Sequence, residues 1–171
     1  MLSRRGAILG GAALLTAGCA GSQQSSNYVS TSSYRGPQVT QVIVAKKRRR
    51  IYLMSGRQVL RQYPIGLGFA PEGDKKVLGD GKTPEGRYYI DRRNPESQFY
   101  LSLGISYPNA RDMAEARRLG EDPGGDIFIH GESPGRMDGR DWTAGCISVS
   151  NPDMEAIYAM VQDGTVIDIL P

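Results

Sequence analysis

The stretch DIFIHGESPGRMDGRDWTAGCISVS, residues 126–150, contains two apolar segments separated by a polar loop. The first segment, residues 126–129, has the composition of a buried strand and ends at His130, the only histidine of the chain. The second segment, residues 147–150, alternates apolar and polar side chains and directly follows Cys146. The pattern therefore predicts two strands that carry a histidine and a cysteine at their loop ends.

His130 and Cys146 suggest cysteine chemistry, because a thiol attacks as its thiolate and a nearby imidazole can take the proton. The alternative is ordinary packing, since free cysteines and lone histidines are often core residues. The neighbouring glycines favour the nucleophile. Gly131 allows a sharp turn after the histidine, and Gly145 precedes the cysteine where a loop enters a strand. At such a junction the amides of Gly145 and Cys146 are expected to point at a developing oxyanion.

The order of these residues resembles the L,D-transpeptidase catalytic domain, also called the YkuD-like domain. Its signature is a His-Gly pair, a spacer, and then a Ser/Thr-x-Gly-Cys element, which corresponds here to His130-Gly131 and Thr143-Ala144-Gly145-Cys146. Upstream, Gly66-Leu67-Gly68 and the segment KTPEGRYYI at residues 82–90 are similar to the family's glycine and TPxGxY segments. The resemblance covers Val39 to Pro171.

The resemblance implies a thiol enzyme that acts on the peptide stems of peptidoglycan without a cofactor. Cys146 would attack the carbonyl of a diamino acid and expel D-alanine, and an amine from a neighbouring stem would resolve the thioester. His130 would serve as general base and acid, oriented through its other ring nitrogen by a backbone carbonyl, which we expect to be that of Gly131. The expected substrate-binding residues are Trp142, Thr143, Ala144, Gly145, Ser148 and Tyr107.

Two positions depart from the family pattern. Most members carry a histidine where this chain has Ala144 and an arginine where it has Ser148. Because the arginine is expected to hold the donor peptide, the identity of the donor stays open. Resolution of the thioester by water, as in an L,D-carboxypeptidase or endopeptidase, and a non-catalytic wall-binding lipoprotein are the alternatives. Trp142 and Tyr107 are expected to wall the groove, although Trp142 could equally be a core residue.

The amino terminus has the pattern of an export signal, residues 1–18. Arg4 and Arg5 precede a short apolar stretch, and Ala17-Gly18-Cys19 is similar to a bacterial lipobox. We expect lipidation at Cys19, with cleavage of an ordinary signal peptide as the alternative and the choice of export route open. Ala20 favours the outer membrane over the inner one. The expected location is the periplasm, where Cys146 would have no disulfide partner once Cys19 is acylated.

Behind this anchor the sequence predicts a polar linker, residues 19–37, and one mainly β, L,D-transpeptidase-like sandwich domain, residues 38–171, with one or two short helices. One helix is expected at residues 112–119, and a second begins with Asn151 as its cap. The long insertion at residues 94–125 is the expected lid over the cleft. We expect a monomer.

The formal charge of +3 offers no argument for a nucleic-acid partner. The basic run Lys46-Lys47-Arg48-Arg49-Arg50 lies between two strand-like segments and is interpreted as a solvated hairpin tip, with contact to anionic glycan or lipid as the alternative. One histidine and one free cysteine fall short of the usual four ligands of structural zinc, so no metal site is expected.

Overall fold

The computed structural model describes residues 34–132 and 141–171. In this part of the chain, eight strands form one sheet in the order β3-β2-β1-β8-β4-β5-β6-β7, with two helices beside it. The strands are β1 (Gln41–Ala45), β2 (Arg50–Ser55), β3 (Gln58–Pro64), β4 (Gly86–Ser97), β5 (Tyr100–Ile105), β6 (Phe128–His130), β7 (Ile147–Ser148) and β8 (Val166–Leu170). The helices are α1 (Ala110–Leu119) and α2 (Asn151–Met160). The predicted mainly β domain is confirmed.

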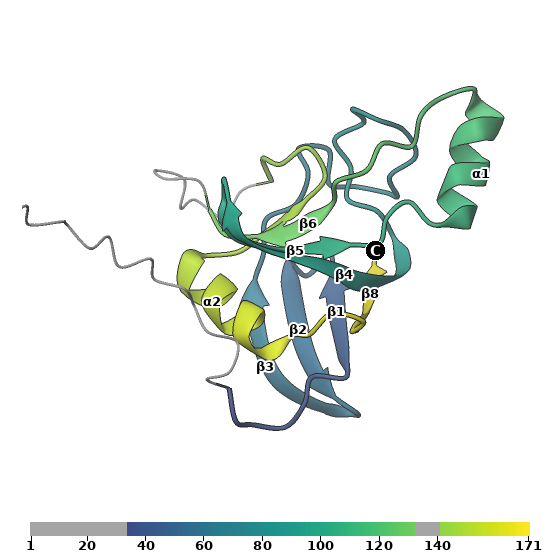
Figure 1. The fold of residues 1–171 in the computed structure, drawn as a ribbon. Helices are drawn as coiled ribbons and strands as arrows, with labels where there is room; N and C mark the ends of the chain where they lie inside the picture. Colours follow the sequence, from purple (N-terminus) through teal and green to yellow (C-terminus); the bar gives the residue numbers. More distant parts are fainter. Residues whose placement is uncertain (1–33, 133–140) are drawn as a thin grey trace, which may run out of the picture.

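The sheet is folded so that its two halves enclose the core. Figure 1 shows β4, β5 and β6 passing in front of β1, β2 and β3. The alternation in β1 and β2 points Val42 and Leu53 inward, where they share one apolar cluster with Leu103 of β5 and Ile147 of β7. This is the sandwich-like arrangement that the strand pattern predicts.

The half of the sheet that carries the site is built around β5. β4 and β6 pair with β5 in antiparallel fashion, and β7 adds to β6 in parallel, with Ile129 opposite Ile147. Residues 101–105 are all buried. The expectation of a lid at residues 94–125 is therefore wrong for its central part, because a buried strand between two neighbours cannot open without breaking the sheet.

The two helices lie in different places, with α1 at the edge of the molecule and α2 beside β5 (Figure 1). α1 begins two residues before the predicted start, with a capping box between Asn109 and Asp112. α2 is capped by Ser150, whose hydroxyl accepts from the Asp153 amide. The expectation of Asn151 as the cap is thus corrected. Its side chain instead accepts from the Glu132 amide at 2.9 Å, directly after the His130-Gly131 pair.

The basic run forms the predicted turn between β1 and β2, but it is not uniformly solvated. Lys46 is buried, and its ammonium donates to the carbonyls of Gly73 and Thr83 and to the carboxylate of Glu85. A buried ammonium needs such partners because desolvation of an unpaired charge is costly. Lys46 therefore holds an internal loop.

No helix in the described ranges, 34–132 and 141–171, is long and apolar enough to cross a membrane.

Candidate active site

His130 lies at the carboxyl end of β6, between Ser102 of β5 and Ser148 of β7. Its side chain is buried, and Nδ1 lies 2.6 Å from the carbonyl oxygen of Gly131. Because a carbonyl can only accept, Nδ1 carries the proton and Nε2 is left as an acceptor. The expected contact with the Gly131 carbonyl is present, so the ring has the tautomer that a general base needs.

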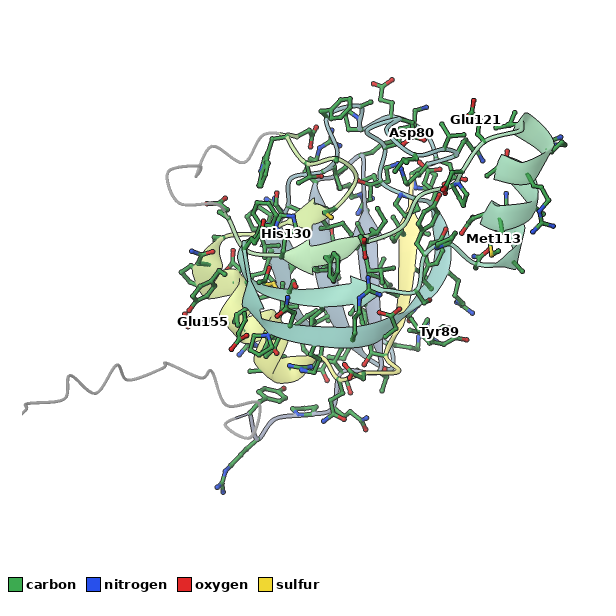
Figure 2. The ribbon with its side chains drawn as sticks, turned by 45° about the horizontal axis from the view of Figure 1, so that its top comes forward. Asp80, Tyr89, Met113, Glu121, His130 and Glu155 are labelled. Atoms are coloured by element: carbon green, nitrogen blue, oxygen red, sulfur yellow. The ribbon has the colours of Figure 1, made fainter. Side chains whose placement is uncertain are left out.

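Two aromatic side chains pack around the imidazole. The ring centroid of Phe99 lies 4.6 Å from that of His130, and the Trp142 centroid lies 5.7 Å away in an edge-on arrangement. Burial lowers the pKa of His130 below its ordinary value of 6.5, and the hydrogen bond to Gly131 opposes this shift only in part. The imidazole is therefore neutral near pH 7. Figure 2 shows His130 on the side of the sheet away from α1.

Cys146 is partly exposed and lies in the turn that enters β7. Its Sγ donates to the backbone carbonyl of Asp126 at 3.4 Å. Burial raises the pKa of the thiol above 9.0, a hydrogen bond from the Phe128 amide lowers it, and the Asp126 carboxylate raises it. The resting pair is thus a protonated thiol and a neutral imidazole, so the nucleophile must be generated by proton transfer.

Both residues open into one cavity of about 320 Å³. The pairing of Ile129 with Ile147 sets Cys146 level with Phe128, so the side chains of Phe128, His130 and Cys146 lie on the same face of the sheet. The S–H group points at the Asp126 carbonyl and must turn from it before His130 can take the proton. The cavity is lined by Asn94, Ser97, Gln98, Phe99, Ser102, Asp126, Phe128, His130 and Cys146.

The turn before Cys146 is shaped by Thr143 and Gly145. The Thr143 hydroxyl donates to the Cys146 carbonyl at 2.7 Å and accepts from the Gly145 amide at 3.1 Å. Gly145 has a φ of 135°, and a Cβ there would lie 2.7 Å from the carbonyl oxygen of Lys82, so only glycine fits. The expectation of a free Gly145 amide is wrong, which leaves the Cys146 amide as the candidate oxyanion donor.

The upstream motif forms a platform under this turn. The Thr83 hydroxyl accepts from the Gly68 amide at 3.1 Å, and Gly68 forms an isolated bridge with Thr143. The carbonyl of Lys82 packs against Gly145, and the ammonium of Lys46 holds the Thr83 carbonyl at 2.9 Å. The upstream motif and the turn before Cys146 therefore pack against each other.

An ion pair that the sequence did not reveal fixes the start of the nucleophile segment. The guanidinium of Arg49 donates to the Asp141 carboxylate through Nε at 3.1 Å and through Nη2 at 2.6 Å. Asp141 also accepts from the Leu67 amide at 2.9 Å, and the Leu67 carbonyl accepts from the Trp142 amide at 3.0 Å. Two parallel hydrogen bonds to one carboxylate fix the orientation of the two side chains relative to each other. The only sequence signal was the basic run that contains Arg49.

The remaining expected substrate-binding residues lie in different places. Tyr107 is buried with its ring edge-on to Tyr88 at 5.9 Å, and its hydroxyl donates to the Pro123 carbonyl at 2.9 Å. It does not line the cavity that holds His130 and Cys146, which corrects the expectation for Tyr107. Ala144 is exposed beside the nucleophile, whereas Ser148 is buried and its backbone pairs with Gly66. Trp142 packs edge-on against the histidine ring but, like Tyr107, is not among the residues that line the cavity.

The described residues include no group of three or more His, Cys, Asp or Glu side chains that could hold a metal ion. The export signal, Cys19 and most of the linker lie outside the described residues, as does part of the loop between His130 and Cys146. The predicted lipidation is therefore not addressed by the structure.

The chain is similar to several known proteins. The sequence pattern of the YkuD family, described as the L,D-transpeptidase catalytic domain, matches residues 40–169. The Escherichia coli K12 protein named "Putative L,D-transpeptidase YafK" is 28% identical over 153 residues, which are 85% of this chain and 57% of that protein. The chain thus spans little more than half of this relative.

Solved structures show the same fold. The helical cell shape determining protein Pgp2 from Campylobacter jejuni is 31% identical with a TM-score of 0.61, over 80% of this chain and 49% of that one. An L,D-transpeptidase from Mycobacterium smegmatis has a TM-score of 0.52 at 16% identity, over 78% of this chain and 59% of that one. The second likeness concerns the fold alone.

Proposed function

The chain belongs to the YkuD family of L,D-transpeptidase catalytic domains, and from this premise we propose that it is a cysteine acyltransferase that cross-links the peptide stems of peptidoglycan. The observation that carries the proposal is the meeting of His130 and Cys146 in one cavity, with Nδ1 of the histidine held by the Gly131 carbonyl. Pgp2 is named a cell shape determining protein, and a contribution of this chain to cell shape is part of the same proposal.

The first half-reaction forms a thioester. Nε2 of His130 takes the thiol proton of Cys146, and the thiolate attacks the stem carbonyl that precedes D-alanine. The oxyanion that develops meets the amide of Cys146. When the intermediate collapses, the bond to D-alanine breaks, and the leaving amine receives the proton from His130.

The second half-reaction releases the thiol. An amine from a neighbouring stem attacks the thioester and gives its proton to His130. Collapse of this intermediate forms the new amide, and the departing thiolate recovers the proton. The neutral imidazole and the protonated thiol that burial favours at rest are the states at which the cycle begins and ends.

A second outcome, hydrolysis of the thioester, is favoured by one observation. Position 148, where most members carry an arginine, holds a buried serine, and branches of the superfamily that lack this arginine include enzymes that hydrolyse. If water replaces the acceptor amine, the same two residues make an L,D-carboxypeptidase or endopeptidase.

The test is the product pattern that purified residues 20–171 make from isolated tetrapeptide stems. Cross-linked dimers support acyl transfer to an amine, whereas shortened monomers support hydrolysis. The Cys146→Ala variant is the control and should give neither product. Absence of both products with the wild-type protein would contradict the proposal and favour a non-catalytic wall-binding role.

We also propose that Cys19 is acylated and tethers the domain in the periplasm, with the outer membrane favoured. The support is the sequence Ala17-Gly18-Cys19 after a short apolar stretch, followed by Ala20. A Cys19→Ser variant should be released in soluble form and should still act on isolated stems, because the tether sets location and not chemistry. Fractionation that finds this variant as firmly bound to membrane as the wild type would contradict the anchor.

A further inference from the structure

One side chain that the mechanism does not use reaches across the sheet toward Cys146. In the β4–β5 ladder Arg92 lies opposite Gly104, and in the β5–β6 ladder Gly104 lies opposite Phe128. Arg92, Gly104 and Phe128 therefore lie in one row across three strands. Cys146 is at the next place in this row, level with Phe128. The next row, Asn94–Ser102–His130, carries the imidazole. Arg92 therefore belongs to the face of the sheet on which the cavity lies.

Gly104 lets the Arg92 side chain lie flat along this row. A Cβ at position 104 would come within 2.4 Å of Cγ and 2.9 Å of Cζ of Arg92, so any larger residue would displace the arginine. The guanidinium carbon lies 4.5 Å from the centre of the Phe128 ring, which lines the cavity. A cation over an aromatic face at this distance is attracted to the ring. The glycine and the phenylalanine together hold the charge beside the nucleophile.

A negative charge lies beside Arg92. Asp126 is one of the residues that line the cavity, its side chain is 91% exposed, and its Oδ1 lies 3.3 Å from Nη2 of Arg92. Asp91 holds the other terminal nitrogen, Nη1, at 2.9 Å. An exposed ion pair of this length contributes little, so a ligand can enter between Arg92 and Asp126 at small cost.

We propose that Arg92 and Asp126 form a recognition pair for the free α-amino-carboxylate end of the stem diamino acid, with Arg92 binding the carboxylate and Asp126 the ammonium. The inference rests on the proposed function, since it names the part of the stem that the pair binds. Arg92 supplies from β4 the cation that is missing at Ser148. Two opposite charges on one rim match a zwitterion better than a single charge of either sign.

The first test compares three stems: one with both groups free, one with this carboxylate amidated and one with this amine acetylated. The wild type should prefer the free stem in kcat/KM. Arg92→Gln should reduce the preference over the amide by about fivefold, and Asp126→Asn should reduce the preference over the acetylated stem to a similar degree. Arg87→Gln is the matched control, because Arg87 is an exposed arginine of the same strand paired with Asp168. Unchanged preferences in both rim variants would overturn the inference.

The second test needs no turnover. The full chain is treated with iodoacetate or its neutral analogue iodoacetamide, and alkylation of the Cys146 peptide is followed by mass spectrometry. Arg92→Gln should lower the iodoacetate-to-iodoacetamide rate ratio by about fivefold, whereas Arg87→Gln should keep it. Gly104→Ala should lower the ratio too, although the charge is still present, because the methyl group displaces the arginine.

The two tests separate the inference from the proposed function. If the iodoacetate-to-iodoacetamide ratio depends on Arg92 but the protein turns over no stem, the charge of Arg92 acts at the cavity and the proposed function is contradicted. Turnover with preferences and a ratio that ignore Arg92 would support the proposed function and overturn the recognition pair.

Discussion

His130 and Cys146 reach the same cavity from two differently built regions. His130 belongs to a strand with hydrogen-bonded neighbours on both sides, and its ring is fixed by the next residue's carbonyl and by Phe99. Cys146 belongs to a turn that distant side chains hold: Arg49 binds Asp141 before the turn, and Thr83 binds Gly68, which bridges to Thr143. The base is thus positioned by the sheet, whereas the nucleophile is positioned by a set of individual contacts.

This difference indicates which substitutions should disturb the site. Strand pairing spreads its stabilisation over many backbone hydrogen bonds, so one surface side chain changes it little. A turn held by a few charged and hydroxyl groups depends on each of them. Substitutions remote from the cavity should therefore affect Cys146 more than His130.

The largest effect should come from Cys146→Ala. Stem turnover should be abolished because Cys146 is the only thiol among the described residues, whereas the circular dichroism spectrum and the melting temperature should stay close to those of the wild type. Turnover assays and thermal melts check both statements. Persistent cleavage or exchange would mean that the thiol is not the nucleophile.

His130→Gln should slow acylation by about 10²–10⁴-fold, which is typical of the loss of a general base. Glutamine keeps a polar group in the strand, so the protein should remain folded. Single-turnover measurements of thioester formation give the rate. A loss of less than tenfold would indicate that the imidazole does not take the thiol proton.

Two forked ion pairs allow the importance of the turn to be measured. Arg49–Asp141 precedes the nucleophile, whereas Arg87–Asp168 joins β4 to β8 away from the cavity. Asp141→Asn should lower kcat/KM by about tenfold, since a hydrogen bond to a charged group contributes about 1.5–3 kcal/mol. The matched variant Asp168→Asn should change kcat/KM by less than about twofold, as expected for an exposed pair.

The same pair of variants can contradict the comparison. If Asp141→Asn and Asp168→Asn reduce kcat/KM equally, the turn before Cys146 does not depend on the Arg49–Asp141 ion pair. The alkylation rate of Cys146 by iodoacetamide provides a second readout that a general loss of stability would not move at temperatures where both variants are folded.

The smallest effect concerns pH. His130 must be neutral to accept a proton, and burial lowers its pKa, so kcat/KM should fall on acidification with a midpoint below 6.5. Phe99→Ala exposes the ring, and the midpoint should then move up toward 6.5. A wild-type midpoint above 6.5 would show that burial does not control the pKa of the imidazole.

In His130→Gln, the alkylation rate of Cys146 should rise with pH toward a midpoint above 9.0, because burial raises the pKa of the thiol.

Much of the fold followed from local patterns. The two strand-like segments on either side of the basic run predicted the hairpin that β1 and β2 form, and a second helix was expected where α2 begins. The caps were less certain: Asn151 and Ser150 are both good capping residues, and only the backbone angles decide between them. The lid expectation failed because the sequence does not show which strands pair with one another, and β5 pairs with β4 and β6 inside the sheet.

The sequence by itself identified the candidate residues of the site, His130 before Gly131 and Cys146 after Gly145, and the family resemblance added the Gly131 carbonyl as the expected partner of the ring. These features depend on residues that are neighbours along the chain. The tertiary structure alone decided that Arg49 meets Asp141 across 92 positions and that Arg92 crosses Gly104 toward Phe128. Such contacts depend on strand register and on how the sheet folds over itself, and neither quantity is encoded in any short segment.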